Sequence, residues 1–414
     1  TNHCVYDCKY CMNRCSNDLP RATFTPDELC RLVIEFYKRN YIEGLFLSSG
    51  VLKNPSYTME RICETLMLLR TKYRFNGYIH VKAIPGAPDE LLSRAGYLAD
   101  RVSINLELPT AQSLSKLAPN KSFKTILEPM EKITGTIAAN RLALGKDARM
   151  ERSSINRYLT GSIFNQNGTD NGQAALSGTQ RTALESGHKL SLPAVSKDMC
   201  VKRPFAPAGQ STQMIIGATP ETDLTLIRTT QHLYKNYDLK RVFYSAYIPL
   251  NEDSALPQLD ADVPLLREHR LYQADWLLRF YGFQADELLS ESRPNFNEQL
   301  DPKCDWAIRH LGQFPVEVQN ASYDMLLRIP GIGPKSARRI VETRRYAKLD
   351  FDILKKIGVV LKRAHYFITC NGRMMYRIPI EESYITSCLT DDNHKENWEI
   401  THQNEKYHQL SLFE

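Results

Sequence analysis

Apolar and polar positions alternate along the chain in two patterns. Apolar runs such as residues 44–50 indicate buried strands, whereas residues 26–41 and 59–73 show helical periodicity. Thr25 and Pro26 predict the start of the first helix, because Thr caps helices and Pro suits the first helical position. Further strands are predicted at 78–84, 101–108, 213–218 and 240–248, and further helices at 89–95, 112–133 and 219–237. This alternation predicts an α/β fold built on a parallel sheet.

The pattern also divides the chain into regions. Residues 135–200 are rich in Gly, Ser, Asn, Thr and Gln, and we expect a flexible insertion there. It separates a first part of the α/β domain (1–134) from its last strands (201–260). Residues 261–370 are predicted to form a helical DNA-binding region, and the polar tail, 371–414, receives no function.

Charge is concentrated in one of these regions. The chain of 414 residues has a net charge of +6 and is 42% hydrophobic, which is typical of a globular protein with more than one domain. Residues 301–370 contain thirteen Lys and Arg and seven Asp and Glu, a difference of +6, so they carry the whole excess. A basic module of this kind is typical of a nucleic-acid interface. No long apolar run is present, so we expect a cytoplasmic protein without a membrane partner.

Three cysteines near the start carry the clearest chemistry. Cys4, Cys8 and Cys11 are spaced Cys-x3-Cys-x2-Cys, and soft thiolates select iron–sulfur clusters or zinc. Three thiolates hold three irons of a [4Fe–4S] cluster and leave the fourth iron open, whereas a purely electron-carrying cluster normally has four cysteines. Zinc, with Cys15 or His3 as fourth ligand, is the alternative. Structural zinc sites usually pair two Cys-x2-Cys knuckles, and this sequence has no second knuckle.

The cysteine spacing resembles the signature of the radical S-adenosylmethionine (SAM) enzymes. The resemblance implies that SAM chelates the open iron and that the reduced cluster cleaves it to a 5′-deoxyadenosyl radical, with electrons from an external donor. It also implies a partial (β/α)6 TIM-like barrel. The family's first strand leads directly into the cysteine loop, and no such strand precedes Cys4, so we expect that strand to be truncated.

The same resemblance suggests where SAM binds, because parallel barrels carry their chemistry at the carboxyl ends of strands. Ser48-Ser49-Gly50 stands where the family has Gly-Gly-Glu, without the Glu that contacts the SAM amino group. Ser103, Asn105 and Glu107 alternate, so they share one face of their predicted strand, either as ligand contacts or as an ordinary polar face. Residues 207–218 loosely resemble the family's adenine-contacting strand. The candidate SAM contacts are Ser48, Ser49, Gly50, Ser103, Asn105, Glu107, Gln213 and Gly217; no catalytic residue is assigned.

A second motif lies at 323–363. Residues 326–340 look like a helix-hairpin-helix DNA-binding element, and 352–363 form a degenerate second copy. Glycines let the hairpin approach a phosphate, the next helix points its N–H groups there, and Lys and Arg add countercharge. Ile332 is expected to pack under the turn. The candidate DNA contacts, which would read backbone rather than sequence, are Gly331, Ile332, Gly333, Lys335, Ser336, Arg338 and Arg339.

The two motifs together resemble a radical SAM family associated with DNA modification or repair. This resemblance implies a SAM-dependent enzyme acting on DNA beside a uracil-DNA-glycosylase-like partner protein. One alternative is an iron–sulfur DNA glycosylase or lyase, in which Lys335 would be the lyase lysine and Asp352 the catalytic acid. Asp352 is better explained as the N-cap of the second hairpin. The other alternative is a non-catalytic iron–sulfur protein that binds DNA or senses redox state.

Overall fold

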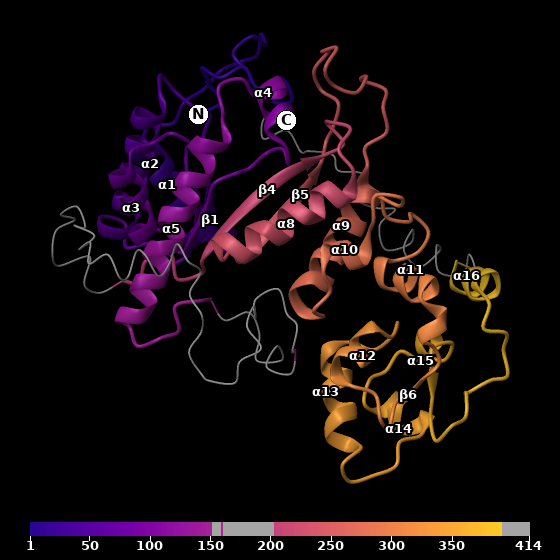
Figure 1. Cartoon of the computed structure of the whole chain (residues 1–414). Helices are drawn as coiled ribbons and strands as arrows, with labels where there is room; N and C mark the ends of the chain where they lie inside the picture. Colours follow the sequence, from indigo (N-terminus) through magenta and orange to yellow (C-terminus); the bar gives the residue numbers. More distant parts are fainter. Residues whose placement is uncertain (151–158, 160–202, 391–414) are drawn as a thin grey trace. The chain divides into compact units, whose positions relative to one another are not determined.

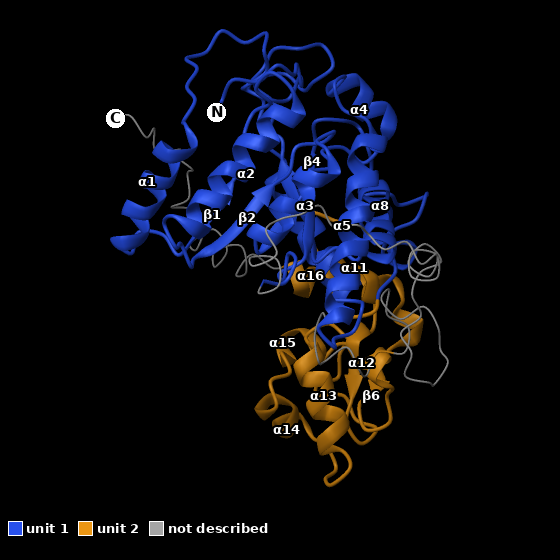
Figure 2. Ribbon diagram, turned by 90° about the vertical axis from the view of Figure 1, so that its left-hand side faces the viewer, with its two compact units in different colours: residues 1–154, 161–279, 283–295 blue, residues 155–160, 280–282, 296–414 orange. Residues whose placement is uncertain are grey.

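A computed structural model describes residues 1–150, 159 and 203–390 of the chain. These residues form two compact units, which are coloured separately in Figure 2. Unit 1 contains residues 1–150, 203–279 and 283–295, and unit 2 contains residues 159, 280–282 and 296–390. The division therefore falls near residue 296, whereas the sequence placed it at 261.

Unit 1 is built on five parallel strands, as the alternating pattern predicted (Figure 1). They lie in the order β1-β2-β3-β4-β5, an open sheet that forms part of a barrel. The third strand is shorter than expected, because Glu107 adopts a positive φ of 68° and makes only an isolated bridge to Met214. The strands are β1 (Gly44–Leu47), β2 (Tyr78–Lys82), β3 (Arg101–Ser103), β4 (Gln210–Ile216) and β5 (Arg241–Ala246).

Helices cover the apolar face of this sheet. Ile79, Val102 and Val242 on that face are completely buried. Along it α1 packs on α2, α2 on α3, α3 on α5 and α5 on α8. The helices of unit 1 are α1 (Pro26–Lys38), α2 (Pro55–Thr71), α3 (Asp89–Leu98), α4 (Ala111–Leu117), α5 (Phe123–Ala143), α8 (Asp223–Tyr237), α9 (Leu265–Phe280) and α10 (Ala285–Leu288).

Helix boundaries confirm some predictions and correct others. Helix α1 begins as expected, with Thr25 and Glu28 forming a capping box. Helix α5 continues to Ala143, so the first residues of the expected insertion are helical; its residues 151–158 and 160–200 lie outside the described part. Thr222, rather than Thr219, caps α8.

Side chains close the outer edge of β5. No further strand pairs with this edge among residues 1–150 and 203–390. Its backbone groups are instead satisfied by α8 and α9: Val242 N–H donates to Tyr234 (3.0 Å), Tyr244 N–H to Tyr272 (3.0 Å) and Ala246 N–H to Glu268 (2.5 Å). The Tyr272 hydroxyl also donates to the Tyr244 carbonyl at 2.8 Å. These bonds explain why α9 belongs to the barrel unit and not to the helical region that follows.

Unit 2 is mainly helical. Two elements were not expected from the sequence: a two-stranded parallel sheet that joins Val316 to Ile368, and a helix inside the predicted tail, whose residues 391–414 lie outside the described part. Among the described residues, no helix is long and apolar enough to span a bilayer. The elements are α11 (Pro302–Arg309), η2 (Leu311–Gln313), β6 (Val316–Glu317), α12 (Tyr323–Arg328), α13 (Pro334–Thr343), α14 (Phe351–Lys356), α15 (Leu361–Ala364), β7 (Ile368–Thr369) and α16 (Glu382–Thr390).

Candidate functional site

The cysteine loop is fastened to the carboxyl ends of the barrel strands. It is held at three places: Val5 N–H donates to the Val51 carbonyl (2.8 Å), Lys9 N–H to the Leu117 carbonyl (2.8 Å), and the Asn251 amide to the carbonyls of Lys9 and Cys11 (2.7 and 3.1 Å). Val51 follows β1, Leu117 ends α4 and Asn251 follows β5. The loop therefore lies where parallel barrels carry their chemistry.

Ion pairs stiffen the same loop. Arg14 binds the Asp7 carboxylate with two hydrogen bonds, of 2.8 and 2.7 Å, and these bonds lower the pKa of Asp7 well below its usual range. Lys9 pairs with Asp253 at 3.0 Å. These ion pairs thus order the loop without using its thiols.

The three thiols are free, and their donor chemistry fits the predicted cluster. Cys8 is buried, and Cys4 and Cys11 are partly exposed. Burial raises the pKa of Cys8, and the ammonium of Lys121 opposes this rise. The Val51 N–H donates to Cys4 Sγ at 3.3 Å. Among the described residues, no three His, Cys, Asp or Glu side chains converge on one centre.

Gly50 is required for the loop to pack against β1. A Cβ at this position would lie 2.4 Å from the His3 carbonyl oxygen. We expect Gly50→Ala to displace the cysteine loop and lower the iron content after reconstitution, with a loss of stability of about 1–3 kcal/mol. Gly135→Ala in α5 is the matched control, because a Cβ there meets nothing within 4 Å. Equal iron content in the two variants would contradict this role.

The face of the sheet that the helices leave uncovered holds three candidate SAM contacts. Ser103, Asn105 and Gln213 line a cavity of about 300 Å³, and Asn105 Nδ2 donates to Gln213 Oε1 at 3.2 Å. The other five candidates lie outside it: Ser48, Ser49 and Gly50 follow β1 beside the cysteine loop, Gly217 lies against Pro264, and Glu107 faces Lys121. The sequence placed Ser103, Asn105 and Glu107 on one face of a strand, whereas in the structure Glu107 lies apart from the cavity that Ser103 and Asn105 line.

Glu107 is a buried carboxylate between the strands and the cysteine loop. Its burial raises the pKa, but Lys121 at 2.9 Å and Lys82 at 3.7 Å outweigh this effect and lower the pKa of Glu107 to about 2. Lys121 also contacts the Tyr10 hydroxyl at 3.4 Å. The site therefore holds one fixed negative charge and two ammonium groups beside the thiols.

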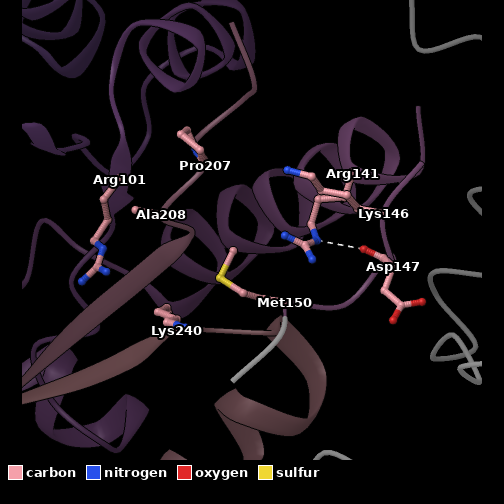
Figure 3. Close-up of a pocket in the computed structure, with 8 residues that line it drawn as sticks. All are labelled: Arg101, Arg141, Lys146, Asp147, Met150, Pro207, Ala208 and Lys240. Carbon is pink, nitrogen blue, oxygen red and sulfur yellow. Dashed lines mark hydrogen bonds between the residues drawn. The ribbon is translucent and has the colours of Figure 1, made fainter. Parts of the chain in front are cut away.

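A second cavity, of about 550 Å³, lies at the opposite end of the strands (Figure 3). Arg101 begins β3, Pro207 and Ala208 precede β4, and Lys240 precedes β5. Arg141 and Lys146 add two further cations, and Arg141 Nε donates to the Asp147 carbonyl at 2.8 Å. Since barrel chemistry lies at the carboxyl ends, this basic cavity is not part of the predicted site.

In unit 2 the predicted hairpins form two paired copies. Helices α12 and α13 are joined through Gly331, and α14 and α15 through Gly358. The two turns meet where Val360 N–H donates to the Gly331 carbonyl at 2.9 Å. Asp350, rather than Asp352, caps α14, with its side chain accepting from Ile353 N–H at 2.7 Å. Asp352 lies in the first turn of α14 and does not have the capping role that the sequence suggested.

The structure sorts the predicted DNA contacts into two groups. Ile332 is buried under the turn as expected, but the Ser336 hydroxyl points inward and donates to the Gly358 carbonyl at 2.8 Å. Lys335 and Arg339 are exposed, and Arg339 also donates to the Ile357 carbonyl at 3.0 Å. Arg338 pairs with Glu342 at 3.5 Å. Gly331 and Gly333 bracket the turn before α13. The side chains of Ile332 and Ser336 therefore serve the fold, and the Ile332 N–H itself donates to the Ile329 carbonyl at 3.2 Å.

Gly331 is required by both backbone conformation and space. Its φ is +83°, and a Cβ would lie 2.5 Å from the Val360 carbonyl oxygen. We expect Gly331→Ala to destabilise unit 2 by about 2–4 kcal/mol and to weaken DNA binding. Gly333→Ala is the control, because φ there is −97° and the nearest atom would be 3.4 Å away. Urea unfolding measures the difference, and equal midpoints would refute the explanation.

Lys303 supports the hairpin from below. Its ammonium is buried and donates to the Ile332 carbonyl at 2.6 Å, and burial lowers the pKa of Lys303 to about 7, although Asp301 opposes the shift. A lysine in the unfolded chain keeps its proton up to about pH 10.4. Between these values the folded state binds fewer protons, so stability should rise from about pH 7 to about pH 10. Urea unfolding across this range should lose that rise in Lys303→Met; a rise of equal size in the variant would contradict the prediction.

Several residues of this site could not be found from the sequence. Lys82 and Lys121 meet Glu107 only because three elements converge, and no local motif marks them. Asn251 likewise lies 240 positions from Cys11, whose carbonyl it binds. The excess of Lys and Arg was the only sequence feature pointing to unit 2 beyond the hairpin motif itself.

Comparisons with known proteins agree with both motifs. Residues 1–137 match the model of the radical SAM superfamily, and residues 316–343 match the helix-hairpin-helix motif. No curated protein matches. Among solved structures, the chain is similar to HydG, a maturase of the [FeFe]-hydrogenase, with 12% identity and a TM-score of 0.38 over 67% of this chain and 49% of HydG, about half its length. The radical SAM family implies a [4Fe–4S] cluster and SAM as cofactors. From these matches, the chain contains the radical SAM domain of an enzyme over residues 1–137, followed by a helix-hairpin-helix motif.

Proposed function

We propose that the protein is a radical SAM enzyme that modifies or repairs DNA by abstracting a hydrogen atom from it. The carrying observation is the presence, in one chain, of a Cys-x3-Cys-x2-Cys loop at the carboxyl ends of a parallel sheet and a paired helix-hairpin-helix unit. Cys4, Cys8 and Cys11 hold the cluster, which with an external electron donor supplies the 5′-deoxyadenosyl radical from SAM.

The chain's own residues then perform separate tasks. Lys121 holds Glu107 ionised close to the thiols, where a carboxylate is suited to bind the ammonium or ribose of SAM. Asn105 and Gln213 offer amides further down the same strands. The turn at Gly331 and the exposed cations Lys335 and Arg339 bind DNA backbone phosphates, with little dependence on sequence. A uracil-DNA-glycosylase-like partner and a cytoplasmic location remain part of the proposal.

Release of 5′-deoxyadenosine tests this function. Anaerobically reconstituted protein is incubated with SAM and dithionite, with no nucleic acid, single-stranded DNA, duplex DNA or RNA. We expect DNA to stimulate release, and Lys335→Glu to reduce that stimulation without changing release in the absence of DNA. Release that is indifferent to every nucleic acid would contradict action on DNA, and stimulation by RNA alone would assign the other polymer.

The iron–sulfur glycosylase alternative predicts a different outcome. It requires base excision or strand cleavage without SAM, and Lys335 as nucleophile. Lys335 lies exposed on α13 and lines neither the cavity of about 300 Å³ nor the cavity of about 550 Å³. We expect no strand cleavage at uracil or abasic sites in the absence of SAM; cleavage that Lys335→Ala removes would favour the alternative.

A further inference from the structure

The cavity on the inner face of the sheet has walls of two kinds. Phe46 on β1 and His80 on β2 form one wall, with ring centroids 4.7 Å apart and planes inclined at 52°. Phe243 on β5 and Tyr272 on α9 are the other aromatic residues of the lining. Between them lie β3, the segment that follows it, and β4, which contribute the amides and hydroxyls of Ser103, Asn105, Ser211, Thr212 and Gln213. Aromatic surfaces flanking hydrogen-bonding groups are suited to a flat ligand with a polar edge.

The residues that line this cavity are uncharged. Its lining residues are Phe46, His80, Ser103, Asn105, Ser211, Thr212, Gln213, Phe243, Tyr244, Ser245 and Tyr272. Burial, together with Arg101, lowers the pKa of His80 to about 4, so its imidazole is neutral at physiological pH. A neutral lining is poorly suited to a phosphate or carboxylate, in contrast to the basic cavity of Figure 3.

Two buried polar atoms in this lining have no hydrogen-bond partner. They are His80 Nε2 and Ser211 Oγ, and the Ser211 side chain is completely inaccessible. Buried polar groups are nearly always paired in folded proteins, so these two leave the polar wall of the cavity incompletely satisfied. A volume of about 300 Å³ is at the lower end of ligand pockets, enough for one heterocycle.

We propose that this cavity binds a single unstacked nucleobase of the nucleic-acid substrate, held between aromatic side chains and read by the amides of Asn105 and Gln213. The proposal rests on the proposed function and specifies its substrate. Asn105 also hydrogen-bonds Glu107, which lies beside the cysteine loop. The base would therefore lie next to the thiol site, separated from it by Glu107. An enzyme that acts on a base must take it out of the stack, and such a pocket receives it. The adenine of SAM shares this chemistry and is the rival occupant.

Phe46 allows a clean test, because it is 58% exposed and its truncation should leave the fold intact. Phe24 is 56% exposed and is absent from the cavity lining, so Phe24→Ala is a control matched in chemistry and exposure. The probe is a single-stranded oligonucleotide with one 2-aminopurine, whose fluorescence falls on stacking. A second oligonucleotide carries an abasic site at the position of the 2-aminopurine. Binding of S-adenosylhomocysteine is measured separately to test the cofactor site.

With the full-length reconstituted protein, we expect 2-aminopurine fluorescence to change with the wild type and Phe24→Ala but not with Phe46→Ala. Loss of one stacking partner should weaken base binding by roughly 5- to 150-fold. Identical behaviour of Phe46→Ala and Phe24→Ala would overturn the proposal while leaving DNA binding intact. Weaker S-adenosylhomocysteine binding alone would also overturn it and assign the cavity to adenine of the cofactor.

Free nucleosides separate the failure of this proposal from failure of the proposed function. In one outcome the protein binds no oligonucleotide but binds free nucleosides, and Phe46→Ala removes this binding whereas Phe24→Ala does not. This result would support the cavity as a base site and contradict action on DNA. If oligonucleotides bind all variants equally without a fluorescence change, the result would contradict the base-binding role of the cavity and leave action on DNA supported.

Discussion

Replacing Lys121 by Met should destabilise the barrel unit by about 3–5 kcal/mol, because it leaves the buried Glu107 carboxylate without its nearest countercharge. Lys82 remains at 3.7 Å, too far to form a hydrogen bond in its place. Urea unfolding at neutral pH measures the loss. The expected consequence for function is weaker binding of SAM, since Glu107 lies beside the thiols.

Lys124→Met is the matched control for this prediction. Lys124 lies three residues away, its side chain is 79% exposed, and its pair with Glu128 is 3.9 Å long. Exposed pairs of this kind contribute about 0–1 kcal/mol. If both variants lose the same small amount, burial of Glu107 does not carry the energy that we assign to it.

Replacing Cys8 by Ser should abolish both the iron–sulfur cluster and the cleavage of SAM. Cys8 is the most buried thiol of the loop, and a serine hydroxyl is a hard ligand that does not replace a thiolate on iron. The measurements are iron and sulfide content after anaerobic reconstitution, and release of 5′-deoxyadenosine. Both should fall to background.

Cys15→Ser provides the control, because Cys15 is exposed and lies outside the Cys-x3-Cys-x2-Cys motif. We expect it to keep a full cluster. Equal loss of metal in the two variants, with zinc in place of iron in the wild type, would instead support the four-ligand zinc site that uses Cys15.

The sequence was most informative where local chemistry decides the structure. Thr25, Pro26 and Glu28 marked the start of α1 because a capping box involves only neighbouring residues. The hairpin was equally readable, since the positive φ of Gly331 and the buried Ile332 belong to one short motif. The apolar runs likewise indicated the strands, because each run is a local feature of the sequence.

Predictions failed where distant elements decide. The strand expected at 101–108 ends at Ser103, because Glu107 turns to reach Lys121, which no local pattern reveals. The sequence also did not reveal that α9 satisfies the outer edge of β5 through Tyr272 and Glu268, which places this helix with the barrel strands. Ser336 appeared to be a DNA contact until its hydroxyl was found on the Gly358 carbonyl of the second hairpin.

The most direct test of the central claim is hydrogen transfer from DNA to the cofactor product. Reconstituted protein is incubated with SAM, dithionite and single-stranded or duplex DNA that is deuterated in its sugars and bases, and the mass of the released 5′-deoxyadenosine is measured. We predict incorporation of deuterium, with Cys8→Ser releasing none of the product. Release of 5′-deoxyadenosine without deuterium from any deuterated DNA would contradict hydrogen abstraction from DNA.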